Sequence, residues 1–487
     1  SHHRVVRCRH RRRNGSWSYA MRTPKQAKAS RGKKKKKQNA SNGTKKDQQN
    51  SIGDGNARVW RPGVDPIEDG EQLDYDPTTY DFLHAMRVEW PCLSFDVLRD
   101  EKGEGRTAFP HEMRLVAGTQ ADAGGKNALV VAKLTNLHQG KHGKKAAQKA
   151  DDSDEEMESS DSEDEEDTEE ERPRLHARMV THSGGVNRIR AMKQMPSVVA
   201  TWSETGHVQV WDLRNQVQAI EEEVPEDATK PKGTVHMAPA HVFSGHKEEG
   251  FALDWSPVVE GRLLSGDCKW AIHLWERGEG GRWMVDRTPF HGHQASVEDL
   301  QWSPTEGNVF ASCSVDKTIK IWDTREKKRP ALGIQASETD INVISWNHIA
   351  TPMLASGDDH GILRIWDLRN FTEGGHVAYF KYHTGPVTSV EWSPFESSSL
   401  ASSSEDHQVA VWDLAVERDA EEEAEAMQVN EGQAEAPDEL PAQLMFVHQG
   451  QKDVKELHWH PQIPGALVTT SSDGFNIYKP SNVGPEV

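Results

Sequence analysis

Histidine, serine and aspartate, the residue types of a hydrolytic triad, recur at fixed offsets along this chain of 487 residues. Two complete sets, each joined by a tryptophan, are His293, Ser312, Asp316 and Trp322, and then His383, Ser402, Asp406 and Trp412. A catalytic site occurs once in an enzyme, whereas this set is copied, so a catalytic role does not fit. We expect a buried chain of hydrogen bonds instead, from the indole N–H through the hydroxyl to histidine and aspartate.

Other sequence signatures of catalysis are missing. The chain has no glycine-rich phosphate loop, no His-Glu-x-x-His motif and no Cys/His ligand spacing. We therefore expect a protein that is not an enzyme and that needs no metal or cofactor. Four cysteines without close pairs favour a reducing compartment, and no apolar run has the length that a bilayer requires.

The repeat that carries these sets has the length of a propeller blade. A strand-like run ends in tryptophan and an acid five times, at Trp211-Asp212, Trp275-Glu276, Trp322-Asp323, Trp366-Asp367 and Trp412-Asp413. A second tryptophan series, mostly within Trp-Ser/His-Pro, has spacings of 47, 44, 46 and 67 residues. A period of about 40–45 residues is typical of a four-stranded blade, and seven units can be traced. Three blades should be less rigid, because Lys269, Ser337 and Tyr478 replace the expected Asp, His and Trp.

The Gly245-His246, Gly292-His293 and Trp-Asp pairs resemble those of the WD-repeat family over roughly residues 90–480. The resemblance implies an all-β fold, a seven-bladed WD-repeat β-propeller. We expect it to carry an N-terminal helix, a disordered basic N-terminal arm and two acidic loop insertions. The expected boundaries are 1–56 for the disordered tail, 57–91 for an outer closing strand and the helix, 92–480 for the propeller with insertions at 139–173 and 416–441, and 481–487 for the C-terminal tail.

Charge is distributed unevenly along the chain. The net charge is −19, yet residues 1–50 hold 17 Lys/Arg and one acidic residue. The basic cluster Lys33, Lys34, Lys35, Lys36 and Lys37 predicts an import signal, and hence a nuclear or nucleolar location, with a solvated tail as the alternative. Residues 1–20 differ in composition from the remainder, so we expect translated upstream sequence there, with Met21 as the natural start.

The first insertion is predicted to be a flexible acidic loop between the third and fourth strands of blade one. Residues 151–171 hold 15 acids in 21 positions, among them Asp151, Asp152, Asp154, Glu155, Glu156, Asp164, Glu165 and Glu166. Such a composition forms no hydrophobic core. Ser153, Ser160 and Ser162 lie close before acidic residues and are candidate phosphorylation sites. An acidic body of this kind should attract basic proteins and repel nucleic acid.

A short helix is predicted over residues 76–90, before blade one. Asp76 suits the N-cap, and Pro77 suits the first turn because its missing N–H has no partner there. Phe82, Met86 and Trp90 form an i, i+4 row. Residues 57–61 are expected to supply the last outer strand and so to close the ring without an unpaired edge.

Several stretches resemble two groups within the WD-repeat family. Tyr80-Asp81 followed by Glu89-Trp90-Pro91 is similar to the N-terminal helix of the histone-binding proteins related to the retinoblastoma-associated chromatin assembly subunits. The stretches 249–257 and 296–304 and the place of the acidic run are closer to the glutamate-rich WD-repeat proteins. That resemblance implies a chaperone for basic clients, principally the third large-subunit ribosomal protein during 60S ribosome assembly, and also histones.

The histone-binding group further implies a groove between the helix and the blade-six insertion, which would hold a basic amphipathic helix of the client. The expected groove residues are Phe82, Leu83, Met86, Asp438, Glu439, Leu440 and Phe446. Asp438 and Glu439 would pair with basic side chains of the client. The alternative is that the helix only covers blade seven with its apolar residues.

Two other roles are compatible with the sequence. Substrate receptors of cullin-4 ubiquitin ligases carry Trp-Asp-x-Arg at the ends of consecutive blades, and Arg214, Arg325 and Arg369 occupy that position here. These arginines would contact the ligase adaptor, although arginine also follows Trp-Asp as an ordinary surface residue. The other role is that of a structural member of a pre-ribosomal particle. No feature predicts membrane binding or sequence-specific nucleic-acid binding.

Overall fold

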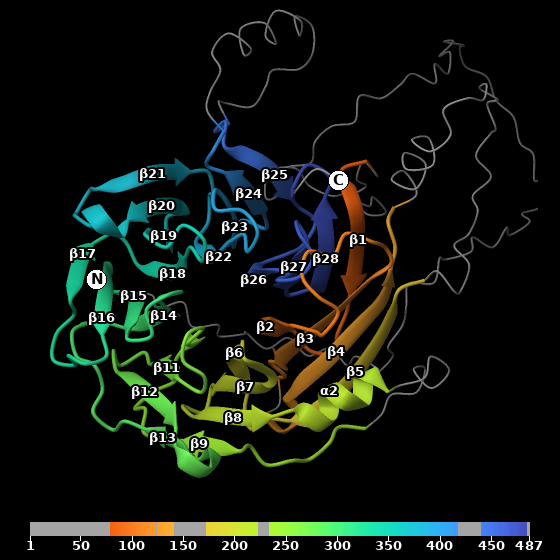
Figure 1. Ribbon diagram of the computed structural model, residues 1–487, viewed down its shortest axis with the longest axis horizontal. Coiled ribbons are helices and arrows are strands. Elements are labelled where there is room, and N and C mark those ends of the chain that lie inside the picture. The colour runs from red at the N-terminus through yellow and green to blue at the C-terminus, as the bar shows by residue number, and fades with distance from the viewer. Residues whose placement is uncertain (1–77, 123, 141–171, 223–232, 417–439, 485–487) are drawn as a thin grey trace, which may run out of the picture.

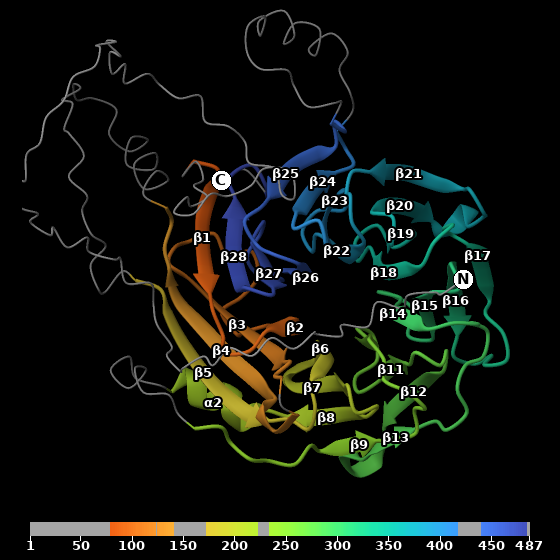
Figure 2. The same cartoon turned by 180° about the vertical axis from the view of Figure 1, so that it is seen from behind.

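The computed structural model describes residues 78–122, 124–140, 172–222, 233–416 and 440–484. Their strands form seven antiparallel sheets of four strands each, arranged around a common centre (Figure 1). The predicted seven-bladed β-propeller is therefore confirmed. The view from behind shows the same closed ring, with the start and the end of the described chain side by side in blade seven (Figure 2).

Each blade runs from an inner strand near the centre to an outer strand at the rim. Blades one to three contain β2 (Cys92–Leu98), β3 (His111–Thr119), β4 (Ala128–Leu137), β5 (Arg174–Thr181), β6 (Val186–Met192), β7 (Met195–Ser203), β8 (Val208–Asp212), β9 (His241–Phe243), β10 (Ala252–Trp255), β11 (Leu263–Gly266), β12 (Ile272–Arg277) and β13 (Trp283–Val285). Blades four and five contain β14 (Val297–Trp302), β15 (Val309–Ser314), β16 (Thr318–Asp323), β17 (Leu332–Gln335), β18 (Ile341–Trp346), β19 (Met353–Asp358), β20 (Ile362–Asp367) and β21 (His376–Lys381). Blades six and seven contain β22 (Val387–Trp392), β23 (Ser399–Ser404), β24 (Val409–Asp413), β25 (Leu444–His448), β26 (Val454–Trp459), β27 (Leu467–Ser471), β28 (Gly474–Pro480) and β1 (Tyr80–Met86).

The hydrophobic core lies between neighbouring blades. In β16, Ile319 and Ile321 are buried while Lys320 between them is partly exposed, as the period of a strand requires. Trp322 packs with Phe310 of its own blade and Leu264 of blade three in one cluster. Each sheet therefore buries both faces against its neighbours, which stabilises the ring as a whole.

Residues 80–86 form a strand, so the helix predicted over residues 76–90 is wrong for this stretch. β1 pairs antiparallel with β28, for example Leu83 with Tyr478 and Met86 with Phe475. Apolar residues four apart lie on one face of a helix, but positions four apart also share a face of a strand. The free edge of β28 decides between the two. A strand beside it pairs with the backbone groups on that edge, whereas a helix would leave them unpaired.

β1 also corrects the prediction for ring closure. The predicted closing strand, residues 57–61, lies outside the described residues, and the place assigned to it beside β28 is occupied by β1. Side chains hold this strand in place. Lys479 on β28 lies 2.6 Å from Asp81, and the Tyr80 hydroxyl lies 2.7 Å from Nδ1 of His448 in blade six.

In the part of the chain that the structure describes, helices are few and lie on connections. α2 (Arg214–Glu221) follows the third strand of blade two and packs against β4 and β5 of blade one. Glu221 pairs there with Arg114 at 2.7 Å and with Lys133 at 2.9 Å. The short 3-10 turns are η1 (Gly124–Lys126), η3 (Glu279–Gly281) and η4 (Leu368–Asn370). Within the described ranges, no helix has the length and apolarity needed to cross a membrane.

Hydrogen bonds join neighbouring inner strands around the centre of the ring. The backbone N–H of Trp302 on β14 donates to the Asp254 carboxylate on β10 at 2.7 Å, and its indole donates to the Asp254 carbonyl at 3.1 Å. Trp459 makes the same two bonds to Glu391, at 2.8 and 3.0 Å. The indoles of Trp255 and Trp392 in the second tryptophan series bond in the same way, whereas that of Trp346 donates to the Thr351 carbonyl of its own blade. Each of the other four indoles thus joins an inner strand to the one before it, in addition to filling the core.

Candidate functional site

The repeated histidine, serine and aspartate residues form hydrogen-bonded chains inside the blades. In blade four the Trp322 indole donates to Ser312 Oγ at 2.8 Å, and Ser312 lies 2.6 Å from His293 Nε2. His293 Nδ1 lies 2.9 Å from Asp316. A consistent set of protons has each member donating to the next, with a neutral histidine. Burial lowers the pKa of His293, although the bond to Asp316 opposes this effect.

Blade six repeats the arrangement with nearly equal distances. The bonds run from Trp412 to Ser402 at 2.9 Å, from Ser402 to His383 at 2.8 Å and from His383 to Asp406 at 3.0 Å. Both serines are fully buried and both ring nitrogens of each histidine are engaged. A buried serine that accepts an indole N–H has no substrate to attack. The arrangement joins strands and turns within each blade through hydrogen bonds.

The blade-three set is complete, which corrects the expectation that Lys269 weakens it. Asp267, two residues before Lys269, lies 3.0 Å from His246 Nδ1, and Ser265 lies 2.7 Å from His246 Nε2. The sequence prediction assumed one fixed offset for the aspartate and so missed Asp267, although an acid in the same turn was visible. The turn between the second and third strands is short enough to supply the carboxylate from either position.

The other departures have different outcomes. In blade five Ser337 occupies the histidine position and donates to Asp358 at 2.8 Å, which also pairs with Arg364 at 2.6 Å. In blade seven Tyr478 is fully buried and stacks on His448 with ring centroids 4.0 Å apart. Ser337 and Tyr478 therefore each have other bonding or stacking partners in place of the expected set.

Three of the residues predicted to form a client groove, Phe82, Met86 and Phe446, are buried in the core. Phe82 and Met86 point into the cluster between blades seven and one and are 2% and 5% exposed. Phe446 on β25 is also buried, and Leu83 is half-buried, both in the cluster between blades six and seven. Leu440 is 49% exposed. Phe82 and Met86 are buried because β1 is a strand, in which successive side chains face the neighbouring blades on its two sides in turn.

The acidic insertions begin and end in equivalent places. Strands β4 and β5 pair on either side of the first insertion, and β24 and β25 pair on either side of the second. Each insertion therefore joins the third and fourth strands of its blade, in blades one and six, which flank blade seven. Near the start of the first, the Gly140 N–H donates to the Asp81 carbonyl of β1 at 2.7 Å. At the base of the second, Gln443 donates to the Val416 carbonyl at 2.9 Å.

Several predicted functional residues lie outside the described residues. They are the acidic residues Asp151, Asp152, Asp154, Glu155, Glu156, Asp164, Glu165 and Glu166, the serines Ser153, Ser160 and Ser162, the lysines Lys33, Lys34, Lys35, Lys36 and Lys37, and the groove acids Asp438 and Glu439. The tail 1–56 also falls there. What the structure shows of these predictions is where the insertions start and end on the ring.

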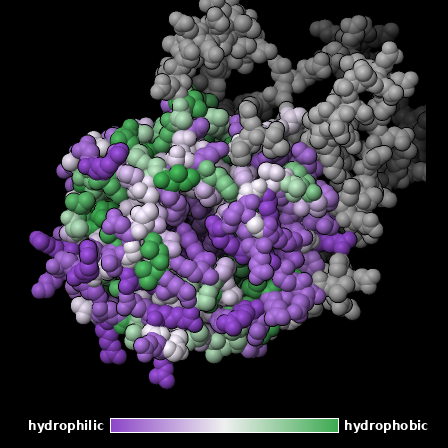
Figure 3. Space-filling view, viewed as in Figure 1, coloured by the Kyte–Doolittle hydropathy of each residue, from purple (hydrophilic) through white to green (hydrophobic). Residues whose placement is uncertain are grey.

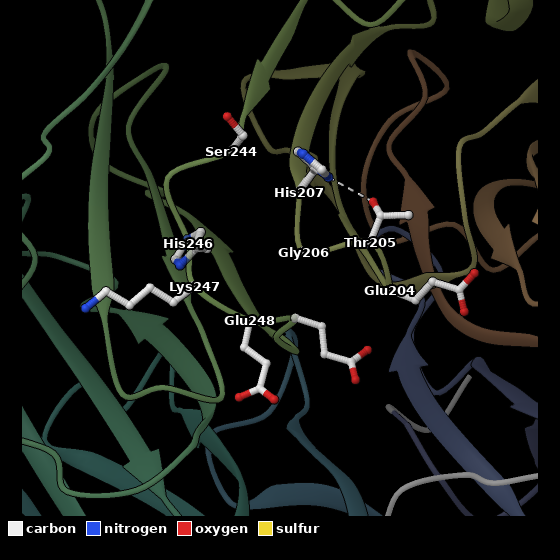
Figure 4. A pocket seen from close by; sticks show the side chains of 9 residues that line it. Glu204, Thr205, Gly206, His207, Ser244, His246, Lys247 and Glu248 are labelled. Atoms are coloured by element: carbon white, nitrogen blue, oxygen red, sulfur yellow. Dashed lines mark hydrogen bonds between the residues drawn. The ribbon is translucent and has the colours of Figure 1, made fainter.

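An open pocket of about 310 Å³ lies between the turns of blades two and three, and its lining is rich in carboxylates (Figure 4). Glu204 comes from the β7–β8 turn, and Glu248 and Glu249 come from the β9–β10 connection. Each of the three has a partner within the protein. Glu204 accepts from the Gly185 N–H at 2.7 Å, Glu248 pairs with Lys269 at 3.1 Å, and Glu249 accepts from Asn187 at 3.1 Å. The lining holds three carboxylates and one lysine, Lys247, and Lys269 adds a second positive charge beside Glu248, so the balance favours a basic ligand over an acidic one.

The polar character extends over the face of the ring seen in Figure 3, which is mainly hydrophilic around its centre. Apolar residues form separate patches on that face, the clearest of them over blades four and five. Outer-strand residues contribute exposed apolar side chains, among them Leu332, Val377 and Tyr379. No group of three potential metal ligands occurs in the described part of the chain.

The three Trp-Asp-x-Arg arginines share one geometry. Arg214 and Arg369 lie 2.9 and 2.6 Å from the aspartate two residues earlier, and Arg325 pairs with Asp323 in the same way. Their side chains are 71–74% exposed. Arg214 differs in its setting, because it begins α2, whereas Arg325 and Arg369 follow the third strands of consecutive blades without an α-helix.

Comparisons with known proteins agree with this architecture. The family model of the histone-binding protein RBBP4, which also describes a component of the CAF1 complex, matches residues 70–138. The model "WD domain, G-beta repeat" matches residues 285–323 and 374–413. The "Glutamate-rich WD repeat-containing protein 1" of Dictyostelium discoideum is 48% identical over 88% of this chain and 86% of its own length. The chain belongs to the glutamate-rich WD-repeat family.

Further relatives of this glutamate-rich WD-repeat protein cover nearly the same range. "Protein HEAT STRESS TOLERANT DWD 1" of Arabidopsis thaliana is 50% identical over 88% of this chain and 92% of its own length. "Ribosome assembly protein rrb1" of Schizosaccharomyces pombe is 40% identical over 86% and 84%. The WD40 propeller domain of Doa1, at 13% identity and a TM-score of 0.50, shares the fold alone. The relatives thus include a ribosome assembly protein, and the histone-binding match covers β1 to β4.

Proposed function

We propose that this protein escorts basic clients in the nucleus and nucleolus, principally the third large-subunit ribosomal protein before its entry into the 60S subunit, and also histones. The observation that carries the proposal is the placement of the two acidic insertions. They leave from equivalent connections of blades one and six, so both open on the same side of the ring, one on each side of blade seven.

Electrostatics explains how such an arrangement would act on a client. A ribosomal protein or histone outside its assembly carries many lysines and arginines that bind RNA non-specifically. Residues 151–171 with 15 acids, and residues 418–439 with nine, supply negative charge on both sides of one blade. Charge of this density attracts a basic protein over roughly 8–10 Å at physiological salt. The carboxylate-lined pocket of Glu204, Glu248 and Glu249 offers a second place for a basic side chain.

The test compares two variants of the full chain that lose the same number of charges. In the first, the acids of residues 151–171 are replaced by Asn and Gln. In the control, an equal number of exposed acids elsewhere are replaced, including Glu279, Glu326 and Glu373. We expect at least a tenfold loss of affinity for the purified ribosomal protein in the first variant, with a weaker salt dependence, and little change in the control. Equal losses in both would attribute binding to net charge alone and would refute a role for the insertion.

Phe82, Met86 and Phe446 stabilise the core, so the client contacts we propose at the second insertion are Asp438 and Glu439 with the exposed Leu440. Replacing Asp438 and Glu439 by lysine should weaken capture of the client without lowering the unfolding temperature. Unchanged affinity would remove this site from the proposal.

A second candidate function is that of a substrate receptor for a cullin-4 ubiquitin ligase. Its support is the common geometry of Arg325 and Arg369, which are exposed on consecutive blades and held by the aspartates of their own motifs. Replacing both by alanine should abolish capture of the ligase adaptor and leave binding of the ribosomal protein unchanged. If the adaptor is not captured by the unaltered protein, this function is excluded.

The nuclear location is tested separately. Replacing Lys33 to Lys37 by serine should move a fluorescent fusion of the full chain out of the nucleus. Retention in the nucleolus would show that the basic cluster is not the import signal.

A further inference from the structure

A cluster of buried charges lies at the centre of the ring, where inner strands of several blades meet. Glu456 on β26 accepts from Arg188 at 2.5 Å and from Arg190 at 2.7 Å, both on β6 of blade two. The Glu456 side chain is 1% exposed. Its other oxygen accepts the backbone N–H of Phe95, on β2 of blade one, at 2.8 Å. One carboxylate of blade seven therefore bonds to blades one and two together.

The cluster continues to blade six through a histidine. His458 Nδ1 lies 3.2 Å from Glu391 on β22, and its Nε2 lies 3.8 Å from Glu456. Glu391 also accepts the backbone N–H of Trp459 at 2.8 Å. These bonds join the inner strands of blades six, seven, one and two in one continuous network.

Arg190 adds contacts between blade two and blade one. Its Nη1 lies 2.8 Å from the carbonyl of Ile189 and 3.4 Å from both the Phe95 carbonyl and Ser94 Oγ, while its Nη2 lies near Glu456. The guanidinium thus bridges β6, β2 and β26. A planar fork of five donors on three nitrogens reaches partners on three strands at once, whereas an ammonium group offers three donors on a single nitrogen.

The blades held by this network include those in which the internal set is altered. The third strand of blade one ends at Leu137 without a Trp-Asp pair, and blade seven carries Tyr478 in the tryptophan position. Blades three, four and six, by contrast, each have a complete chain from tryptophan to aspartate within the blade. The buried charges therefore connect blades one and seven, where this bonded chain within the blade is incomplete.

We propose that Glu456, Arg188 and Arg190 form a lock that makes blades seven, one and two open as one cooperative unit. A buried ion pair that loses one partner leaves an uncompensated charge in a water-poor place. Opening blade seven or blade two alone would leave such a charge in the other, and opening blade one alone would remove the Phe95 N–H that Glu456 accepts. Because the cost is shared, partial opening of one blade is disfavoured relative to opening of all three. The lock stands on these contacts and does not depend on the proposed client.

The test is amide hydrogen exchange on the full chain, comparing Glu456→Gln with Asp316→Asn. Gln has the shape of Glu and keeps an oxygen for the Phe95 N–H, but it removes the negative charge between the arginines. Asp316→Asn is the matched control, because it alters one partly buried carboxylate whose histidine partner lies within blade four. We expect Glu456→Gln to raise exchange rates in β2, β6 and β26 together by at least tenfold. The control should raise exchange rates in β14 to β16 and leave the rates in β2, β6 and β26 unchanged.

Three results would overturn the lock. They are no change in Glu456→Gln, a rise confined to β26, or an equal rise in all seven blades. If Glu456→Gln does not fold, Arg190→Lys serves instead, since it keeps the charge and loses the bridging fork. The same three strands should then respond together with a smaller amplitude, and a response confined to β6 would count against the proposal.

Discussion

The hydrogen-bonded chain of blade four allows a quantitative prediction from one buried oxygen. Ser312→Ala removes the acceptor of the Trp322 indole and the partner of His293 Nε2, which lie 2.8 and 2.6 Å from Ser312 Oγ. All three side chains are buried. A buried polar group left without a partner costs about 1–3 kcal/mol. Two such groups should lower the free energy of unfolding by about 2–6 kcal/mol.

Blade five supplies the matched comparison. Ser356 accepts the Trp366 indole at 2.9 Å, but Ser337 replaces the histidine and donates to Asp358 instead. Ser356→Ala should therefore leave one group without a partner and cost about 1–3 kcal/mol, half the cost of Ser312→Ala. Ser312→Thr is the rescue variant. Thr201 already fills this position in blade two and bonds to His182 and Trp211 at 3.0 and 3.1 Å.

Urea unfolding of the three variants and the unaltered protein measures these differences. Tryptophan fluorescence and circular dichroism should be followed together, so that a common midpoint establishes a single transition. The expected order of destabilisation is Ser312→Ala, then Ser356→Ala, then Ser312→Thr. A cost for Ser312→Ala no larger than that for Ser356→Ala would refute the reasoning, because the histidine would then contribute nothing to the chain.

Three further predictions concern pH, closure and the insertions. Burial lowers the pKa of His448 to about 3, so the folded state favours neutral histidine, and the contribution of this residue to stability should fall by roughly 1.4 kcal/mol per unit as pH drops from 6.5 to about 3; His448→Gln should remove that part of the slope in urea titrations. Tyr80→Phe loses the 2.7 Å bond to His448 and should cost about 1 kcal/mol, seen as faster exchange in β1 and not in β14. Deleting residues 151–171 should change the unfolding free energy by less than about 1 kcal/mol in the same titration, since loop-closure entropy varies slowly with length; a larger loss would mean that the segment packs on the ring.

The sequence predicted the ring and its internal bonds because both depend on local, repeated signals. The offsets of His293, Ser312 and Trp322 reflect the register of neighbouring strands, in which Ser312 and Trp322 lie one strand apart. A fixed register in every blade produces a fixed spacing in the chain. Asp267 was missed for the same reason, since a turn can supply the carboxylate from more than one position without changing the register.

Closure of the ring could not be predicted in the same way. The apolar residues Phe82 and Met86 are compatible with a helix or a strand, and only the free edge of β28, almost 400 residues away, selects the strand. The lock at Glu456 leaves no local signal either. Arg188, Arg190 and Glu456 are ordinary charged residues in the sequence and become a buried cluster only when blades two and seven meet.

The insertions occupy connections whose length can change without breaking the pairing of the strands on either side. The β24–β25 pairing continues from Val409 with His448 to Trp412 with Leu444, although the long second insertion separates the two strands. The β4–β5 pairing likewise runs unbroken from Ala128 with Thr181 to Thr135 with Arg174. A connection between the third and fourth strands lies at the rim, so its length does not disturb the inner strands that hold the ring. Two such connections on either side of blade seven can therefore carry dense negative charge, while the Glu456 network keeps the blades beneath them together.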